Sequence, residues 1–319
     1  MKQYLFTCIA ILVLISSCAS LTKSQVEAVH QFAKTSRDFS AYPSEILTAM
    51  AELRVKRGVY FTNSLQDPDD ESSDDNIDSL NELAVTSHVK ELNDIYKAKK
   101  DDYIASEKAN ITFKIIDKYA QSLLLLSSDK HAADMETQAA NFGVSLDSLI
   151  SKYNSIQGAT KVSPGIGGLI GSLIMAGGKQ FIRVKQAKEI QRFVPAADKM
   201  IGIMSGNLLE FLESGKIASL IANEEKGIQS NYRSFLRHRK PYIQNEWDYL
   251  ELLAHLDRIK ALRDQTIEAT NSLRAAHSEL LTAIKEKKTL TEAIAGVQSL
   301  YEDVNEIRST IHELHTVKN

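Results

Sequence analysis

The stretch LTEAIAGVQSLYEDVNEIRSTIHEL, residues 290–314, decides the fold. Its apolar residues recur every three or four positions, a spacing that places them on one side of an α-helix; they are Leu290, Ile294, Val297, Tyr301, Val304, Ile307, Ile311 and Leu314. An apolar side this narrow is typical of coiled coils and long bundles, because a helix can bury it only against another helix. The stretch therefore predicts a long helix packed in a bundle.

The preceding stretch repeats the pattern over a greater length. Residues in a similar register are Leu252, Leu256, Ile259 and Leu262, and then Leu273, Leu280 and Ile284. No helix breaker lies between Pro241 and Lys287, so the sequence predicts a helix of about 45 residues, or about 65 Å at 1.5 Å per residue. Further helices are expected over 23–63, 79–126, 132–156, 180–192 and 196–237, with a weak point at Gly202–Gly206. An acidic, polar linker over 66–78 separates the first two.

The predicted fold class is all-α, an elongated bundle of long antiparallel helices that resembles a coiled coil. The chain has 319 residues and only five prolines, and no segment shows the alternation of a β-strand. We expect residues 23–319 to form a single elongated domain.

The amino-terminal residues have the pattern of a secretory leader. Lys2 is followed by an apolar run from Leu5 to Ile15, which is shorter than the roughly 20 apolar residues needed to span a bilayer. The run ends in Ile15-Ser16-Ser17-Cys18, which resembles the lipobox of bacterial lipoproteins. The resemblance implies cleavage before Cys18 and acylation of Cys18, for example by palmitate. The alternative is an ordinary secretory signal with a chance cysteine at its end.

This leader divides the chain into a signal peptide over 1–17, a lipidated anchor over 18–22 and the helical domain. The only other cysteine, Cys8, would be removed with the leader, so the mature protein has no disulfide and no thiolate site. No aspartate follows Cys18, and in lipoproteins of diderm bacteria this implies the outer membrane. We expect the protein to be held there by its lipid, facing the periplasm.

The segment from Val162 to Gly178 is the most unusual part of the domain. It contains six of the fourteen glycines, and no charged residue lies between Lys161 and Lys179. Gly167 and Gly171 have the small-xxx-small spacing that lets two helices approach closely. The next residues are basic and amphipathic, which suits an anionic lipid surface. The candidate residues for contact with a membrane or a partner are Gly167, Ile170, Gly171, Ile174, Lys179 and Arg183. The alternative is a buried, closely packed turn or helix.

Long helices with a glycine-rich apolar element in mid-chain are similar in outline to α-helical pore-forming toxins of the haemolysin E kind. This resemblance implies a membrane-active protein that uses residues 162–193. It rests on no shared motif, and a lipid anchor departs from those secreted toxins.

The sequence offers no catalytic constellation, and we expect no enzyme, no cofactor and no metal site. It has no nucleophile elbow and no phosphate-binding loop. His312 and His315 could share a metal from one helix face, but a solvated helix end is the favoured explanation of this pair. A net charge of −3 argues against nucleic acid as a partner. The first function predicted is therefore a lipid-anchored, non-enzymatic scaffold or binding module of the cell envelope, with a protein partner or self-association.

Overall fold

The structure is a computed structural model that describes residues 21–42, 44–65, 90, 93, 107–128, 135–156, 159–175, 183–238, 243–286 and 291–316. Its helices are α2 (Lys23–Ser40), α3 (Ser44–Leu65), α5 (Glu107–Ser127), α6 (Met135–Asn154), α7 (Ile166–Met175), α8 (Arg183–Glu213), α9 (Gly215–His238), α10 (Ile243–Glu286) and α11 (Thr291–Thr316). The described residues form no strand, so the predicted all-α class is confirmed. The acidic linker over 66–78 lies outside the described residues.

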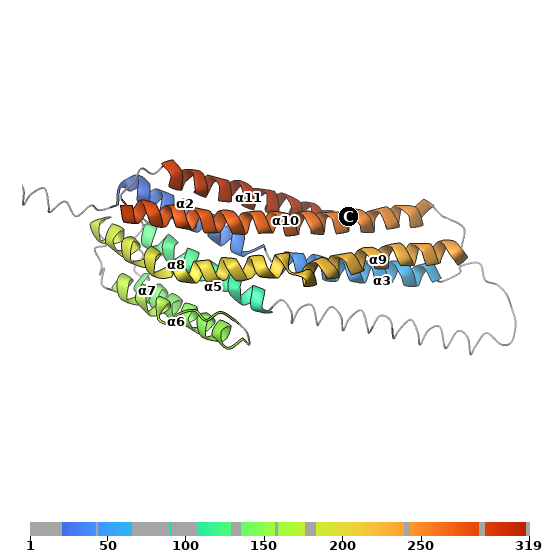
Figure 1. Cartoon of the computed structure of the whole chain (residues 1–319), viewed down its shortest axis with the longest axis horizontal. Coiled ribbons are helices and arrows are strands. Elements are labelled where there is room, and N and C mark those ends of the chain that lie inside the picture. Colours follow the sequence, from blue (N-terminus) through green and yellow to red (C-terminus); the bar gives the residue numbers. More distant parts are fainter. Residues whose placement is uncertain are drawn as a thin grey trace, which may run out of the picture.

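The helices form a bundle around α10, the longest of them (Figure 1). α10 packs against α2, α3, α8, α9 and α11. Along one side of the molecule α2 is continued by α3, and along another α8 is continued by α9 (Figure 1). α5, α6, α7 and α11 lie beside the half of the bundle where α2 begins. The other half consists mainly of α3, α9 and the start of α10.

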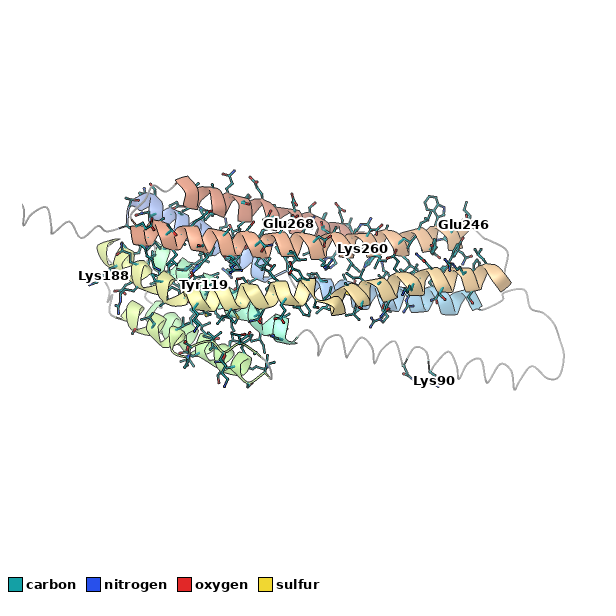
Figure 2. All side chains as sticks on the ribbon, viewed as in Figure 1. Lys90, Tyr119, Lys188, Glu246, Lys260 and Glu268 are labelled. Atoms are coloured by element: carbon teal, nitrogen blue, oxygen red, sulfur yellow. The ribbon has the colours of Figure 1, made fainter. Side chains whose placement is uncertain are left out.

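α10 carries a mainly apolar side from Leu252 to Ile284, and burial of this side stabilises the long helix. It has 44 residues, in agreement with the helix predicted after Pro241, and corresponds to a length of about 66 Å. The predicted apolar residues are buried along it: Leu252, Leu256, Ile259, Leu262, Leu273, Leu280 and Ile284. Each such side chain contributes about 1.5–3 kcal/mol when it leaves water. Lys188 and Glu246 mark opposite ends of the bundle (Figure 2).

The register of α11 differs from the prediction in its first half. The buried apolar residues are Ala293, Val297, Leu300, Val304, Ile307, Ile311 and Leu314, which alternate by four and three positions as in a heptad repeat. Ile294 and Tyr301 were predicted to be buried, but they are 49% and 52% exposed. The prediction was wrong there because it favoured these large side chains over Ala293 and Leu300, each one position earlier.

α8 also differs from the prediction, because it continues through Pro195, Gly202 and Gly206 and ends at Glu213. A proline inside a helix costs about 3 kcal/mol. The apolar residues around it are fully buried and together outweigh that cost; they include Phe193, Val194, Ala197, Met200, Ile201 and Met204. The break between α8 and α9 lies instead at Ser214.

A buried ion cluster joins α3 to α9. Glu224 on α9 is 3% exposed, and its two carboxylate oxygens face two arginines of α3. Its Oε1 lies 2.7 Å from Nε of Arg54, and its Oε2 lies 3.1 Å from Nε of Arg57. Gly227 makes room for this cluster, because an added Cβ would overlap the guanidinium of Arg57.

Replacing Glu224 by Gln should destabilise the protein, because two arginines would keep their charges without the carboxylate that balances them. We expect the free energy of unfolding in urea to fall by about 3 kcal/mol or more. The matched control is Glu225→Gln at the next position, whose partly exposed ion pair with Lys260 spans 3.2 Å. That change should cost less than about 1 kcal/mol. Equal losses in the two variants would contradict the assigned role of Glu224.

Candidate functional site

The structure describes the predicted contact residues only in part. Cys18 and Lys179 lie outside the described residues. Ile170, Gly171 and Ile174 are helical positions of α7, and Arg183 is the first residue of α8. Gly167, at the start of α7, is described in full.

Two polar residues of α6 fix the start of α7. The carboxylate of Asp147 accepts hydrogen bonds from the backbone N–H groups of Gly165, Gly167 and Gly168, at 3.2, 2.9 and 2.9 Å. These are free donors of a helix amino terminus, where negative charge is also favoured by the helix dipole. Asn154 forms a second pair of hydrogen bonds with the backbone of Val162. Gly165 has a φ of 92°, which a residue with a side chain would adopt only with strain. α6 and α7 are therefore joined as a closed hairpin.

Gly167 lies at a close contact between the two helices of this hairpin. It is buried, and an added Cβ would overlap the backbone carbonyl oxygen of Gly143 on α6. The partner of Gly167 in the structure is thus another helix of the same chain. Contact of the 162–178 segment with a membrane stays a prediction. Among the described residues, no helix has both the length and the apolar character required to cross a bilayer.

Substitution of Gly167 by Ala should open the contact between α6 and α7. We expect a loss of about 1–3 kcal/mol in the free energy of unfolding, as for other overpacked sites. Gly168→Ala is the matched control, because its added Cβ would meet only Oδ2 of Asp147, at an ordinary 3.7 Å. The control should be neutral or stabilised by up to about 1 kcal/mol through its higher helix propensity. Chemical denaturation of both variants measures this, and a destabilised Gly168→Ala would contradict it.

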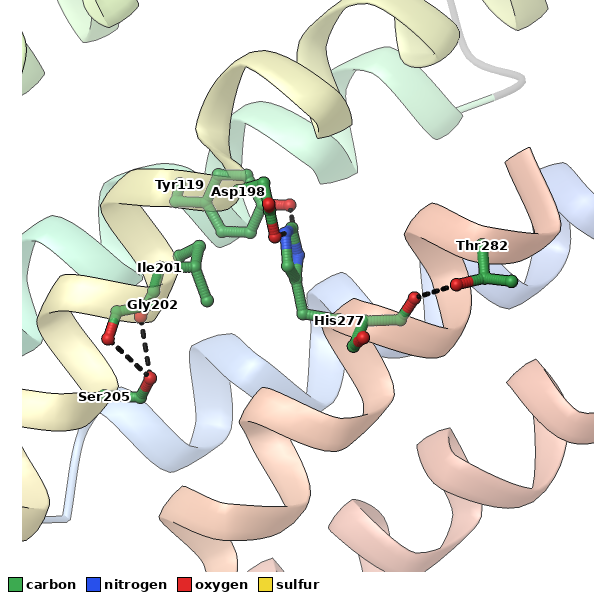
Figure 3. A network of polar contacts seen from close by, with 8 residues as sticks. Tyr119, Asp198, Ile201, Gly202, Ser205, His277 and Thr282 are labelled. Atoms are coloured by element: carbon green, nitrogen blue, oxygen red, sulfur yellow. Dashed lines mark hydrogen bonds and ion pairs between the residues drawn. The ribbon is translucent and has the colours of Figure 1, made fainter. Parts of the chain in front are cut away.

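A polar network lies in the core between α5, α8 and α10 (Figure 3). Tyr119 of α5 and His277 of α10 are both fully buried, and the Tyr119 hydroxyl lies 3.0 Å from Nδ1 of His277. The other ring nitrogen, Nε2, lies 3.4 Å from Oδ1 of Asp198 on α8. A carboxylate can only accept, so Nε2 carries the proton and Nδ1 accepts from Tyr119. Phe32 and Phe193 pack against these rings.

Burial dominates the ionisation of this network. It lowers the pKa of His277 to about 4, although Asp198 acts in the opposite direction. Burial, with a smaller contribution from Asp198, raises the pKa of Tyr119 well above its usual value. At neutral pH the imidazole and the phenol are thus uncharged. Aromatic rings surround the network. Its arrangement suits a structural lock between helices.

The described residues contain no cluster of three or more side chains that could hold a metal ion. His312 and His315 are both exposed on α11, and His315 lies 3.7 Å from Glu45 of α3.

Two exposed apolar surfaces lie at opposite ends of the bundle. The first is the distal stripe, formed by Ile243, Trp247 and Leu250 at the start of α10, which are 66%, 63% and 52% exposed. Trp247 is the chain's only tryptophan. Nearby Tyr249 packs toward α9, stacking on Tyr232 with 4.2 Å between the ring centroids.

The second surface is the amino-terminal groove between α2 and α11, with a volume of about 530 Å³. Ala28 and Val297 are buried at its floor, and Ile294 and Tyr301 are its exposed apolar walls. The remaining lining residues are polar: Lys23, Ser24, Glu27, Gln31, Thr35 and Gln298. Sequence reasoning missed this groove because it placed both walls in the core. The sequence did contain a signal for the groove. Ile294 and Tyr301 are seven residues apart, so they lie on one side of α11, and each comes one position after a residue of the buried heptad pattern.

Acid should weaken the fold through His277. Its pKa is about 4 when folded and near 6.5 when unfolded, so the unfolded chain binds more protons between these values. Stability is therefore complete above about pH 6.5 and falls as the pH drops, with a loss of about 3 kcal/mol by pH 4.

Denaturation of His277→Gln at several pH values tests this, because a neutral amide removes that titration. The variant should show a smaller loss of stability between pH 7 and pH 4 than the parent. His312→Gln, which changes an exposed histidine, should retain the parent's acid dependence. Identical acid profiles for His277→Gln and the parent would exclude His277 as the cause.

No family model matches the chain, and comparisons with curated proteins and with solved structures give no match. Function is therefore indicated by the surfaces and networks of the molecule itself. Of these, the distal stripe and the amino-terminal groove are open to other molecules, whereas the Tyr119–His277 network is enclosed.

Proposed function

We propose that the protein is a lipid-anchored, non-enzymatic binding module of the bacterial cell envelope. Lipid on Cys18 holds it to the outer membrane, facing the periplasm, and the distal stripe binds a protein partner. Two facts support the anchor: the lipobox-like run Ile15-Ser16-Ser17-Cys18, and the buried position of Leu21 in the bundle, three residues later.

The distal stripe is the observation that carries the binding role. Farther along α10 the exposed residues in line with it are polar or small: Ala254, Asp257, Ala261, Asp264, Glu268, Asn271, Ala275 and Ser278. Only at the start of the helix does this line become apolar, with an exposed tryptophan between an isoleucine and a leucine. Large aromatic side chains are enriched among the residues that dominate binding energy at protein interfaces.

The charged residues beside the stripe indicate the charge expected on the partner's surface. Glu246 and Glu251 flank the stripe on α10, and both are exposed. The spacing of Ile243, Trp247 and Leu250 by four and three positions matches one side of an amphipathic helix. A partner helix with an apolar side and basic residues along its edges would complement both features.

The stripe and the start of α2, the described helix nearest to Cys18 in the sequence, lie at opposite ends of the bundle (Figure 1). α2 begins at one end and α10 at the other. Since α10 is about 66 Å long at 1.5 Å per residue, the partner would be held tens of ångströms from the anchor.

A second candidate function is membrane activity through residues 162–193. It is favoured by the uncharged run between Lys161 and Lys179 and by the basic residues that follow. Vesicle leakage caused by the purified protein and abolished by Ile170→Asp would favour this function over the first.

Cross-linking in living cells tests the binding role. A photoreactive amino acid replaces Trp247 in one strain and Ala261 in another, and Ala261 is the matched control on the same exposed line of α10. We expect position 247 to cross-link to a defined protein and position 261 to give none. Cells fed with labelled palmitate test the anchor, since Cys18→Ser should lose both the label and the membrane association. A labelled Cys18→Ser protein, or equal cross-linking at both positions, would overturn the proposal.

A further inference from the structure

The amino-terminal groove begins beside the first residues of α2, and this end is called its mouth. Leu21 is buried in the core, and Thr22 caps α2 through reciprocal hydrogen bonds with Gln25. Cys18 is three residues before Leu21, so its Cα lies within about 11 Å of the Leu21 Cα, even with the chain fully extended. The first lining residues, Lys23 and Ser24, follow at once. Any group attached to Cys18 is thus tethered beside the mouth of the groove.

The groove runs along α2 away from this mouth. From Lys23 to Thr35 it follows twelve residues, which is about 18 Å of helix. Beyond it, Arg308 of α11 reaches across to α2. Its Nη2 lies 3.2 Å from Oδ2 of Asp38, and its Nε donates to the hydroxyl of Tyr42 at 2.9 Å. The groove is therefore long and narrow, and polar contacts between α2 and α11 follow its far end.

The lining selects an uncharged, apolar occupant. Its floor is Ala28 and Val297, and its walls are Ile294 and Tyr301. Lys23 and Glu27 at the rim have opposite charges, so the rim offers neither a cation nor an anion a net attraction. A flexible hydrocarbon chain meets these conditions, because it needs no hydrogen bonds and can follow a groove between two helices.

We propose that the amino-terminal groove binds an acyl chain of the lipid on the chain's own Cys18. This inference rests on the lipid anchor of the proposed function. The groove removes part of the hydrocarbon from water, as the bilayer does. The tether favours this acyl chain over any free apolar ligand, because a group attached nearby has a high effective concentration. With one acyl chain in the groove, the other acyl chains remain in the membrane and the bundle is held close to the bilayer surface.

Photocross-linking of the lipid tests this proposal in the full-length protein in its own membrane. Cells receive a fatty acid with a photoreactive group in mid-chain, and mass spectrometry first establishes whether it is attached at Cys18. After irradiation, the expected product is a link from the acyl chain to peptides that contain Ala28, Ile294 or Tyr301. If the label is present on Cys18 but links form to phospholipid alone, the proposal for the groove is overturned and the proposal for the anchor stands. An unlabelled Cys18 would overturn the anchor, and the groove proposal with it.

The double variant Ile294→Asp, Tyr301→Asp supplies the specificity control. Both side chains are about half exposed, so charged replacements should leave the bundle folded, which circular dichroism would verify. We expect the intramolecular link to fall about tenfold. Ile243→Asp changes a similarly exposed apolar residue at the other end of the bundle and should leave the link unchanged. Equal yields in the double variant and the parent would show that the acyl chain lies elsewhere.

Discussion

The requirement that α10 bury one side from Leu252 to Ile284 governs this structure. A helix of 44 residues depends on its neighbours for stability, since most helix stability in proteins comes from packing an apolar side. No other described helix is as long, so successive partners cover its apolar side, with α3 and α9 near its start and α2, α8 and α11 farther along. The joints at Tyr42 and Ser214 follow from this, because they let two shorter helices in line accompany one long helix.

Apolar contacts alone would allow long helices to slide past each other by a turn. Two buried polar groups oppose this, because each has its partners at only one register. Glu224 must meet both arginines of α3, and His277 must meet both Tyr119 and Asp198. A shift of one turn would leave a buried charge or a buried imidazole unsatisfied, which costs more than the contacts contribute when formed. The first group fixes α9 against α3, and the second fixes α10 against α5 and α8.

Spacing within one helix was predictable from the sequence, and contacts between helices were not. The bounds of α10 and its buried side follow from apolar periodicity over a stretch without proline. The buried register of α11 was missed in its first half because Ala293 and Leu300 compete there with the larger Ile294 and Tyr301. The helix through Pro195 was missed because its cost is offset by burial against other helices. Tyr119, Asp198 and His277 are far apart in the sequence, so no local pattern could bring them together. The groove and the distal stripe were missed for a related reason, since periodicity identifies an apolar side but not whether a neighbour covers it.

The capped start of α2 has a mechanical consequence. A protein tethered by a long flexible linker can explore a broad volume and meet partners in any orientation. Here the packed bundle already includes Leu21, so if Cys18 carried lipid, its Cα would be separated from the bundle by only three residues. The tip would then stay at a nearly constant distance from the anchor point. A partner would be selected by its distance from that point as well as by its surface chemistry, and a change in the length of α10 would alter that selection without any change in the stripe itself.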